Sequence, residues 1–393
     1  MWFIAIAVAF FFILDPFRLF QQSNVPRMRV DRQVEREMIE FLTVSPPAAD
    51  YVVESLQGRD LVLIGETGFI KEQLEFLAEL IPVLDTAGIR HLGFQYANRD
   101  DQELIDRLLT APDFDESLAN RILFEHMVVM GYEEHRDVFR AAWNVNRGKG
   151  DGEQPFRIIG ISRTPDYRVI RTEEDADDPE VLRQAFARGI PDEAMAESIM
   201  QQIVEPGHRG VAYMRLEHAY TGFAQEQYRG RMEDRGFPGQ KRAGNILADR
   251  LGARVMSIIM HTPLQDSRSR FGFGYPLGGL LERVKSELPE GHRPGFTVRE
   301  SPYAEAPITS DMITEGREGD LPFEQYADGY LLISRIADYR AVTPIPGFIT
   351  ADNLERARTD FPGPDPGEVS VGEMNEFISG MAGSMAQIIE RFD

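Results

Sequence analysis

The segment DLVLIGETGFIKE, residues 60–72, decides the fold that the sequence predicts. Residues 61–64 are apolar without interruption, which is typical of a strand in a parallel sheet whose two faces are covered by helices. Glu66 follows at the carboxyl end of this strand, where α/β proteins bind their ligands. Glu66 is therefore the first candidate site residue. The alternative is that it only caps the next helix, whose N-terminus favours a negative charge by about 0.3–1 kcal/mol.

Short apolar runs alternate with helical patterns along most of the remaining chain. Further strands are expected at residues 90–96, 156–161, 211–216, 254–260, 296–299 and 329–334. Helical patterns cover residues 70–86, 102–109, 116–130, 132–146, 179–204, 243–251, 280–288 and 371–392. For the first two strands and the helix between them we expect a right-handed crossover and parallel pairing. The sequence therefore predicts an α/β fold: a central, mainly parallel sheet with helices on both faces and a ligand crevice at the strand C-terminal ends.

The composition excludes several functional classes. A chain of 393 residues with 42% hydrophobic residues is expected to fold as a globular protein. The absence of cysteine excludes disulfides, cysteine-ligated metal sites and a thiol nucleophile. A net charge of −22 argues against a nucleic-acid partner. Only four of the 42 basic residues are lysine, which indicates either a saline environment or a GC-rich coding bias.

The N-terminal segment is strongly apolar. Residues 2–14 would span only about 20 Å as a helix, less than the bilayer's hydrocarbon core of about 30 Å. The segment has neither the basic region nor the cleavage site that a cleaved signal peptide usually has. We therefore expect an uncleaved membrane anchor that reaches residue 20, or alternatively a helix packed on the domain. The predicted organisation is an anchor or helix at 1–20, a helical lead-in at 21–58, an α/β domain at 59–362 and a C-terminal helix at 363–393.

Polar side chains stand at the ends of five predicted strands. They are Glu66, Gln95, Ser162, His218 and His261. Because the carboxyl ends of parallel strands meet at one edge of a sheet, we expect these side chains to converge on one pocket for a small-molecule ligand. The other histidines fall at strand starts, on helices or in loops, and we interpret them as structural: His91, His126, His135, His208 and His292.

The segment GETGFIKE at residues 65–72 resembles the Gly-Glu-x-His-Gly segment of the erythromycin esterase-like, ChaN-like haem-binding and Tiki-like protease superfamily. Further similarity runs through residues 92–109, 157–162, 216–222 (LEHAYTG), 244–263 and 327–357. The resemblance implies an α/β fold with a strand-end pocket in which Glu and His residues bind a metal or activate water. It also implies that the protein hydrolyses ester or peptide bonds, or binds haem.

The chain departs from this pattern at three positions. Gly68 stands where the resemblance implies His, Gln95 where it implies Glu, and Ser162 where Asp is common. Glycine can neither ligate a metal nor transfer a proton, and an amide is not a general base at neutral pH.

Two hypotheses follow from the retained and the missing groups. The first is a membrane-tethered, catalytically degenerate domain that binds a ligand, with Gln95 and Ser162 lining the pocket and with haem, on His218 or His261, or a divalent metal as cofactor. The alternative is a metal-dependent hydrolase in which Glu66 is the general base and Glu66, His218 and His261 hold the metal.

Overall fold

A computed structural model describes residues 24–27, 31–150, 152–266, 269, 271–308 and 321–392 of the chain. The predicted anchor at residues 1–20 lies outside these residues. Within the described ranges, no helix is both long enough and apolar enough to cross a membrane.

The predicted central sheet is confirmed, and it has seven strands in the order β3-β2-β4-β1-β5-β11-β8. Neighbouring strands are parallel except β11 and β8, which are antiparallel. The strands are β1 (Leu61–Glu66), β2 (His91–Asn98), β3 (Arg157–Ser162), β4 (Gly210–Arg215), β5 (Val255–Met260), β8 (Gly295–Thr297) and β11 (Gly329–Leu331). Two small two-stranded sheets pair β6 (Leu264–Gln265) with β7 (Phe273–Gly274), and β9 (Pro307–Ile308) with β10 (Leu321–Pro322).

The predicted pairing of the first two strands is wrong, because β4 lies between β1 and β2. Gly210 at the start of β4 is in register with Leu61 on one side and with His91 on the other. The two strands remain parallel, but each pairs with β4 and not with the other, while β5 flanks β1 and β3 flanks β2 on their far sides. β1 occupies the middle of the sheet, and all six of its residues are buried, as its apolar run predicts.

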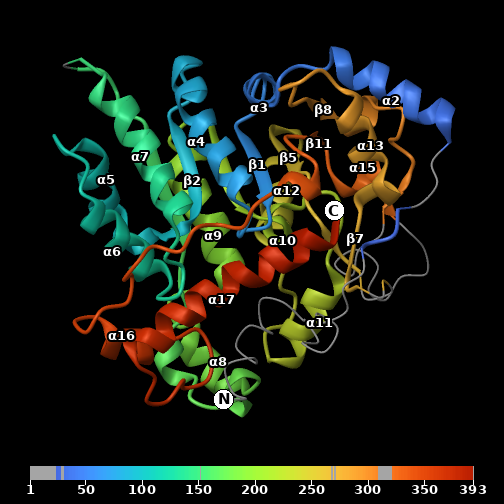
Figure 1. Cartoon of the computed structure of the whole chain (residues 1–393). Coiled ribbons are helices and arrows are strands. Elements are labelled where there is room, and N and C mark those ends of the chain that lie inside the picture. Colours follow the sequence, from blue (N-terminus) through green and yellow to red (C-terminus); the bar gives the residue numbers. More distant parts are fainter. Residues whose placement is uncertain are drawn as a thin grey trace.

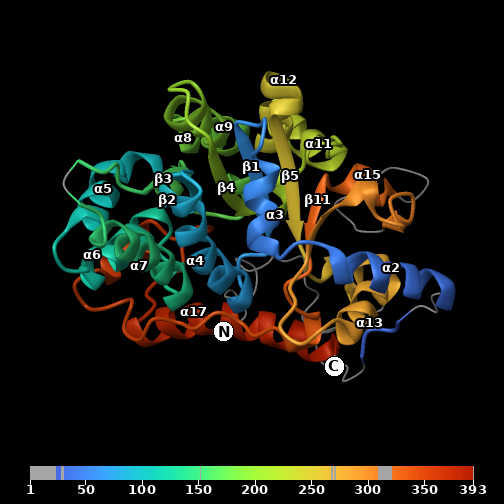
Figure 2. The same ribbon diagram turned by 90° about the horizontal axis from the view of Figure 1, so that it is seen from above.

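Helices cover both faces of the sheet (Figure 2). On one face, α3 (Ala48–Ser55), α4 (Lys71–Thr86), α7 (Glu133–Arg147) and α17 (Val371–Ile389) pack around Val62 and Ile64 of β1. On the other face, α9 (Pro191–Ile199) and α12 (Ala243–Leu251) pack around Leu61 and Leu63. The alternating side chains of one strand thus contribute to two apolar cores.

The other α-helices of the described residues surround these layers (Figure 1). They are α2 (Arg32–Val44), α5 (Gln102–Thr110), α6 (Glu116–His126), α8 (Pro179–Ala185), α10 (Leu216–Ala219), α11 (Glu226–Asp234), α13 (Leu280–Glu287), α15 (Phe323–Tyr326) and α16 (Leu354–Thr359). The predicted break near residues 189–191 separates α8 from α9. α6 ends four residues earlier than the 116–130 pattern predicts, because Met127 has an extended backbone.

Candidate functional site

A pocket of about 170 Å³ opens at the carboxyl ends of β2, β3 and β4. These strands contribute Gln95 and Tyr96, Ser162, and Arg215 respectively, and α10 adds Glu217 and His218. Much of the remaining wall is apolar and includes Phe69, Met127, Met130 and Met195. The site therefore lies at the sheet edge where the sequence predicts it, and three of the five predicted side chains line it: Gln95, Ser162 and His218.

His218 is held by a buried carboxylate. Its Nδ1 lies 2.6 Å from Oδ1 of Asp192, a residue of α9 that is 2% exposed. Burial alone would raise the pKa of Asp192, but the charges of His218 and Arg242 outweigh burial and hold this pKa well below its usual range. The ionised carboxylate accepts the Nδ1 proton, so that whenever the ring is neutral its lone pair is on Nε2, which makes no hydrogen bond to the described residues.

A second ion pair lies beside His218 in the pocket wall. Nε of Arg215 donates to Oε1 of Glu217 at 2.7 Å. Burial would raise the pKa of Glu217, but the positive charges around it, chiefly that of Arg215, lower the pKa to about 2. The backbone N–H of Arg215 donates to Oε1 of Gln95 at 2.6 Å. This amide therefore fixes the end of β4 to the end of β2, a role that needs an acceptor and not a charge.

Glu66, the first predicted site residue, does not line the pocket. Its side chain is fully buried and accepts hydrogen bonds from the Tyr96 hydroxyl, at 2.6 Å, and from the backbone N–H of Gly68. Burial raises the pKa of Glu66 to about 7, against the opposing effects of the Tyr96 hydrogen bond and the charge of Arg215. Glu66 therefore acts on the pocket through the Tyr96 hydroxyl.

Ser162, the last residue of β3, lines the pocket, but its hydroxyl is already hydrogen-bonded. Its Oγ donates to the backbone carbonyl of Gln95 at 2.6 Å, so its proton is used within the sheet. A carboxylate at this position would face that carbonyl with no proton to donate.

The side chain of His261 is directed away from the pocket. Its Nδ1 lies 2.8 Å from the Tyr330 hydroxyl and its Nε2 lies 2.6 Å from Oε1 of Glu282. Glu282 also accepts from the backbone N–H of Ile336. His261 thus joins β5 to α13 and to the segment after β11, and the structure does not bring it together with His218.

This arrangement does not fit the predicted cofactors. Both ring nitrogens of His261 are occupied, and among the described residues no group of three His, Cys, Asp or Glu side chains is placed to hold a metal ion. The pocket of about 170 Å³ is also smaller than the roughly 300–1,000 Å³ of typical ligand and cofactor pockets, so haem does not fit it.

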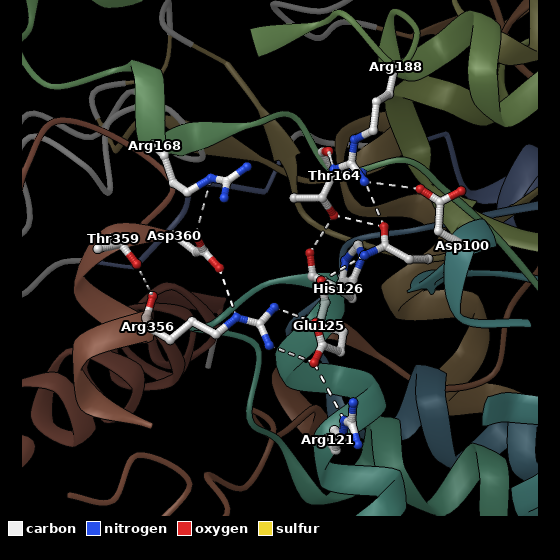
Figure 3. A network of polar contacts seen from close by, with 11 residues as sticks. Asp100, Arg121, Glu125, His126, Thr164, Arg168, Arg188, Arg356, Thr359 and Asp360 are labelled. Carbon is white, nitrogen blue, oxygen red and sulfur yellow. Dashed lines mark hydrogen bonds and ion pairs between the residues drawn. The ribbon is translucent and has the colours of Figure 1, made fainter. Parts of the chain in front are cut away.

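A network of polar contacts includes two residues of the pocket wall, His126 and Thr164 (Figure 3). Arg356 of α16 donates to Glu125 of α6 at 2.7 Å, and Arg188 donates to Asp100 at 3.1 Å. Thr164, which follows β3 and lines the pocket, donates from Oγ1 to the backbone carbonyl of His126 at 2.5 Å. The Thr164 contact fixes the end of α6 to the segment that follows β3, and the Arg356 contact fixes the same end of α6 to α16.

Sequence reasoning missed several residues of this site. His126, interpreted as only structural, lines the pocket together with Tyr96 and Glu217. Asp192 reads in sequence as an ordinary acidic residue of a helix N-terminus after Pro191. Tyr96 carried a usable signal, because it follows Gln95 at the carboxyl end of a predicted strand, where ligands bind.

The chain resembles several solved structures at low sequence identity. A Bacillus cereus protein aligns with a TM-score of 0.50 and 12% identity, over 79% of this chain and 98% of that chain. A succinoglycan biosynthesis protein aligns with a TM-score of 0.52 and 10% identity, over 80% and 100% of the two chains. A mutant of the erythromycin esterase EreC in its open conformation aligns with a TM-score of 0.42 and 10% identity, over 79% and 97%.

At this level of identity the first two likenesses show a shared fold alone. No family model matches the sequence. No curated protein matches it either.

Proposed function

We propose that this domain hydrolyses small esters, with His218 as the general base. The observation that carries the proposal is the pairing of His218 with the buried carboxylate of Asp192 at the wall of a pocket. Asp192 orients the ring and fixes its tautomer, which leaves the Nε2 lone pair to accept a proton.

The reaction balances on these groups. Nε2 takes a proton from water while the water oxygen bonds to the carbonyl carbon of the ester. As the bond from that carbon to the alkoxy oxygen breaks, the imidazolium returns the proton to the leaving alcohol. The products are a carboxylic acid and an alcohol. Glu66 is a positioning residue in this scheme, because its contact with the pocket runs through the Tyr96 hydroxyl.

The second candidate is a domain that binds its ligand without turnover. It is favoured by the absence of a charged group at Gly68, Gln95 and Ser162 and by the engagement of the last two in hydrogen bonds to the backbone. A Cβ on Gly68 would lie 2.6 Å from the Tyr96 hydroxyl oxygen, so this space is already taken. A protein that kept the pocket for binding but lost catalytic activity would be expected to have uncharged residues at these three positions.

Hydrolysis of p-nitrophenyl butyrate, a short ester, separates the two candidates. The variants are His218→Asn and Asp192→Asn, and His208→Asn serves as the control, since His208 is exposed and precedes β4 at the opposite edge of the sheet. We expect kcat to fall by about 10²–10⁴-fold in His218→Asn, the range for loss of a general base. Asp192→Asn should lower kcat with little change in KM, and the control should match the wild type.

Full activity of His218→Asn would rule out the proposed base. A wild-type protein without turnover would favour binding alone.

Membrane tethering through residues 2–20 is part of the same proposal. It is supported by the uninterrupted apolar run at residues 2–14. The full-length protein should then sediment with membranes, resist extraction by high salt and be released by detergent. Recovery of the full-length protein in the soluble fraction would argue against the tether.

A further inference from the structure

His126 presents unused polar atoms at the wall of the pocket. It is the last residue of α6, it is 6% exposed, and it lines the pocket. Its Nδ1 is buried without a hydrogen-bond partner, and its Nε2 makes no hydrogen bond within the described ranges. A buried polar group that lacks a partner costs about 1–3 kcal/mol, so a ring in this position calls for a partner outside the protein.

The position of the ring is nevertheless fixed. The backbone carbonyl of His126 accepts from Thr164, and its neighbour Glu125 is held by Arg356 (Figure 3). The ring packs edge-on against Tyr96, with 5.9 Å between the ring centroids. Packing and backbone contacts therefore orient the imidazole. Nε2, which unlike Nδ1 is not buried, is the ring nitrogen left for a ligand.

The polar character of this wall favours an uncharged ligand. Burial lowers the pKa of His126 to about 4, so the ring is neutral at pH 7 and offers one N–H donor and one acceptor. The charges nearby are already compensated, since Arg215 pairs with Glu217 and Arg163 pairs with Asp100. An ionic ligand would find no unpaired counter-charge among these side chains.

We infer that His126 is a ligand-binding residue that hydrogen-bonds the carbonyl of an uncharged ester with a short apolar acyl chain. The inference rests on the proposed function for its assignment of the pocket to the substrate. The acyl chain lies against Met127, Met130 and Met195, whose side chains adapt readily to apolar shapes. The size of the pocket, about 170 Å³, limits this chain to a few carbons.

The first test measures binding without turnover. The probe is N-ethylbutyramide, an uncharged amide of the size of a short ester. In wild-type protein labelled with ¹⁵N, the ring signals of His126 should shift as the probe is added, and those of His135 should not. This readout needs no variant and no catalysis. Ring signals of His126 that stay in place at saturating probe would overturn the inference.

The second test compares His126→Phe with His135→Phe. His135 is a matched control, because it is also a buried histidine and its ring nitrogens lack a hydrogen-bond partner, but it does not line the pocket. Both changes keep an aromatic ring. Loss of one hydrogen bond worth about 1.4 kcal/mol should weaken binding of the probe about tenfold in His126→Phe, and raise KM for p-nitrophenyl butyrate similarly. His135→Phe should leave both unchanged.

The outcomes distinguish the inference from the proposed function. Probe binding that depends on His126, in a protein that hydrolyses no ester, would support the inference and contradict the hydrolase. If a folded His126→Phe hydrolyses the ester and binds the probe like the wild type, the inference is contradicted and the proposed hydrolase is supported. Circular dichroism of each variant establishes that it is folded.

Discussion

At the scale of single residues, the site combines two carboxylates in opposite electrostatic states. Asp192 is stabilised as an anion by His218 and Arg242, whereas burial favours the protonated form of Glu66. Two carboxyl groups can take different roles in one site when their surroundings shift their pKa values in opposite directions. Asp192 can orient a base at any pH above the acid range, and Glu66 changes its charge near neutrality.

We predict that Glu66 makes stability fall as pH rises from 4 to 8. Its pKa is about 7 in the folded protein and 4.5 without the effects of the fold, so the folded state holds a proton that the unfolded state has already released. The free energy of unfolding should therefore decrease by about 3 kcal/mol through Glu66, at about 1.4 kcal/mol per pKa unit.

Urea unfolding of the wild type and of Glu66→Gln at pH 4 and pH 8 measures this contribution. The amide also loses a hydrogen bond, but that loss is independent of pH and cancels in the comparison between the two pH values. Parallel pH curves for the two proteins would show that the carboxyl of Glu66 titrates normally.

Single residues also show where reasoning from the sequence ends. The positions of Gln95, Ser162 and His218 follow from the strand pattern, because a strand end fixes where a side chain starts. The direction of a side chain depends on partners distant in sequence. His261 is directed toward Tyr330 and Glu282, and the contact of His218 with Asp192 joins residues on two different helices. No local pattern contains such contacts.

At the scale of elements, the sequence predicts the strands themselves, but it does not predict that β4 lies between β1 and β2. Mainly apolar runs located all five long strands, because strands covered on both faces have few polar positions. Which strand lies beside which is set by packing across the whole sheet. In sequence β4 comes after β1, β2 and β3, but in the sheet it lies between β1 and β2.

The central place of β1 leads to a stability prediction. Ile64 is fully buried between helices, so Ile64→Ala should reduce the free energy of unfolding by about 2–5 kcal/mol. Val44→Ala is the control, because Val44 at the end of α2 is 82% exposed and should change the free energy of unfolding by less than about 0.5 kcal/mol. Urea denaturation measures both. Similar small effects at the two positions would mean that β1 is not central.

At the scale of the whole molecule, the C-terminal helix completes the core of the α/β domain. α17 buries six large apolar side chains in the same cluster that contains Val62 and Ile64: Met374, Ile378, Met381, Met385, Ile388 and Ile389. The Tyr132 hydroxyl also donates to the backbone carbonyl of Ile378 at 3.0 Å. The predicted boundary at residue 362 therefore falls within one continuous apolar core.

We predict that a chain ending at residue 362 does not fold. Burial of six such side chains at about 1.5–3 kcal/mol each is comparable with the whole stability of a typical domain, about 5–15 kcal/mol. The truncated chain should lack a cooperative thermal transition in calorimetry. Gln387→Ala, on the exposed side of α17, should unfold like the wild type. A cooperative transition in the truncated chain would show that α17 is an appendage.

The insertion of β4 between β1 and β2 also constrains the order of events during synthesis. β1 and β2 are synthesised before β4, and the strand edges that pair with β4 stay unpaired until residues 210–215 have been made. Open strand edges are templates for pairing with other chains, and contacts between segments far apart in sequence form slowly. The nascent chain thus carries its central hydrogen-bonding positions unpaired through more than a third of its translation, and during that interval these strand edges are open to pairing with other chains.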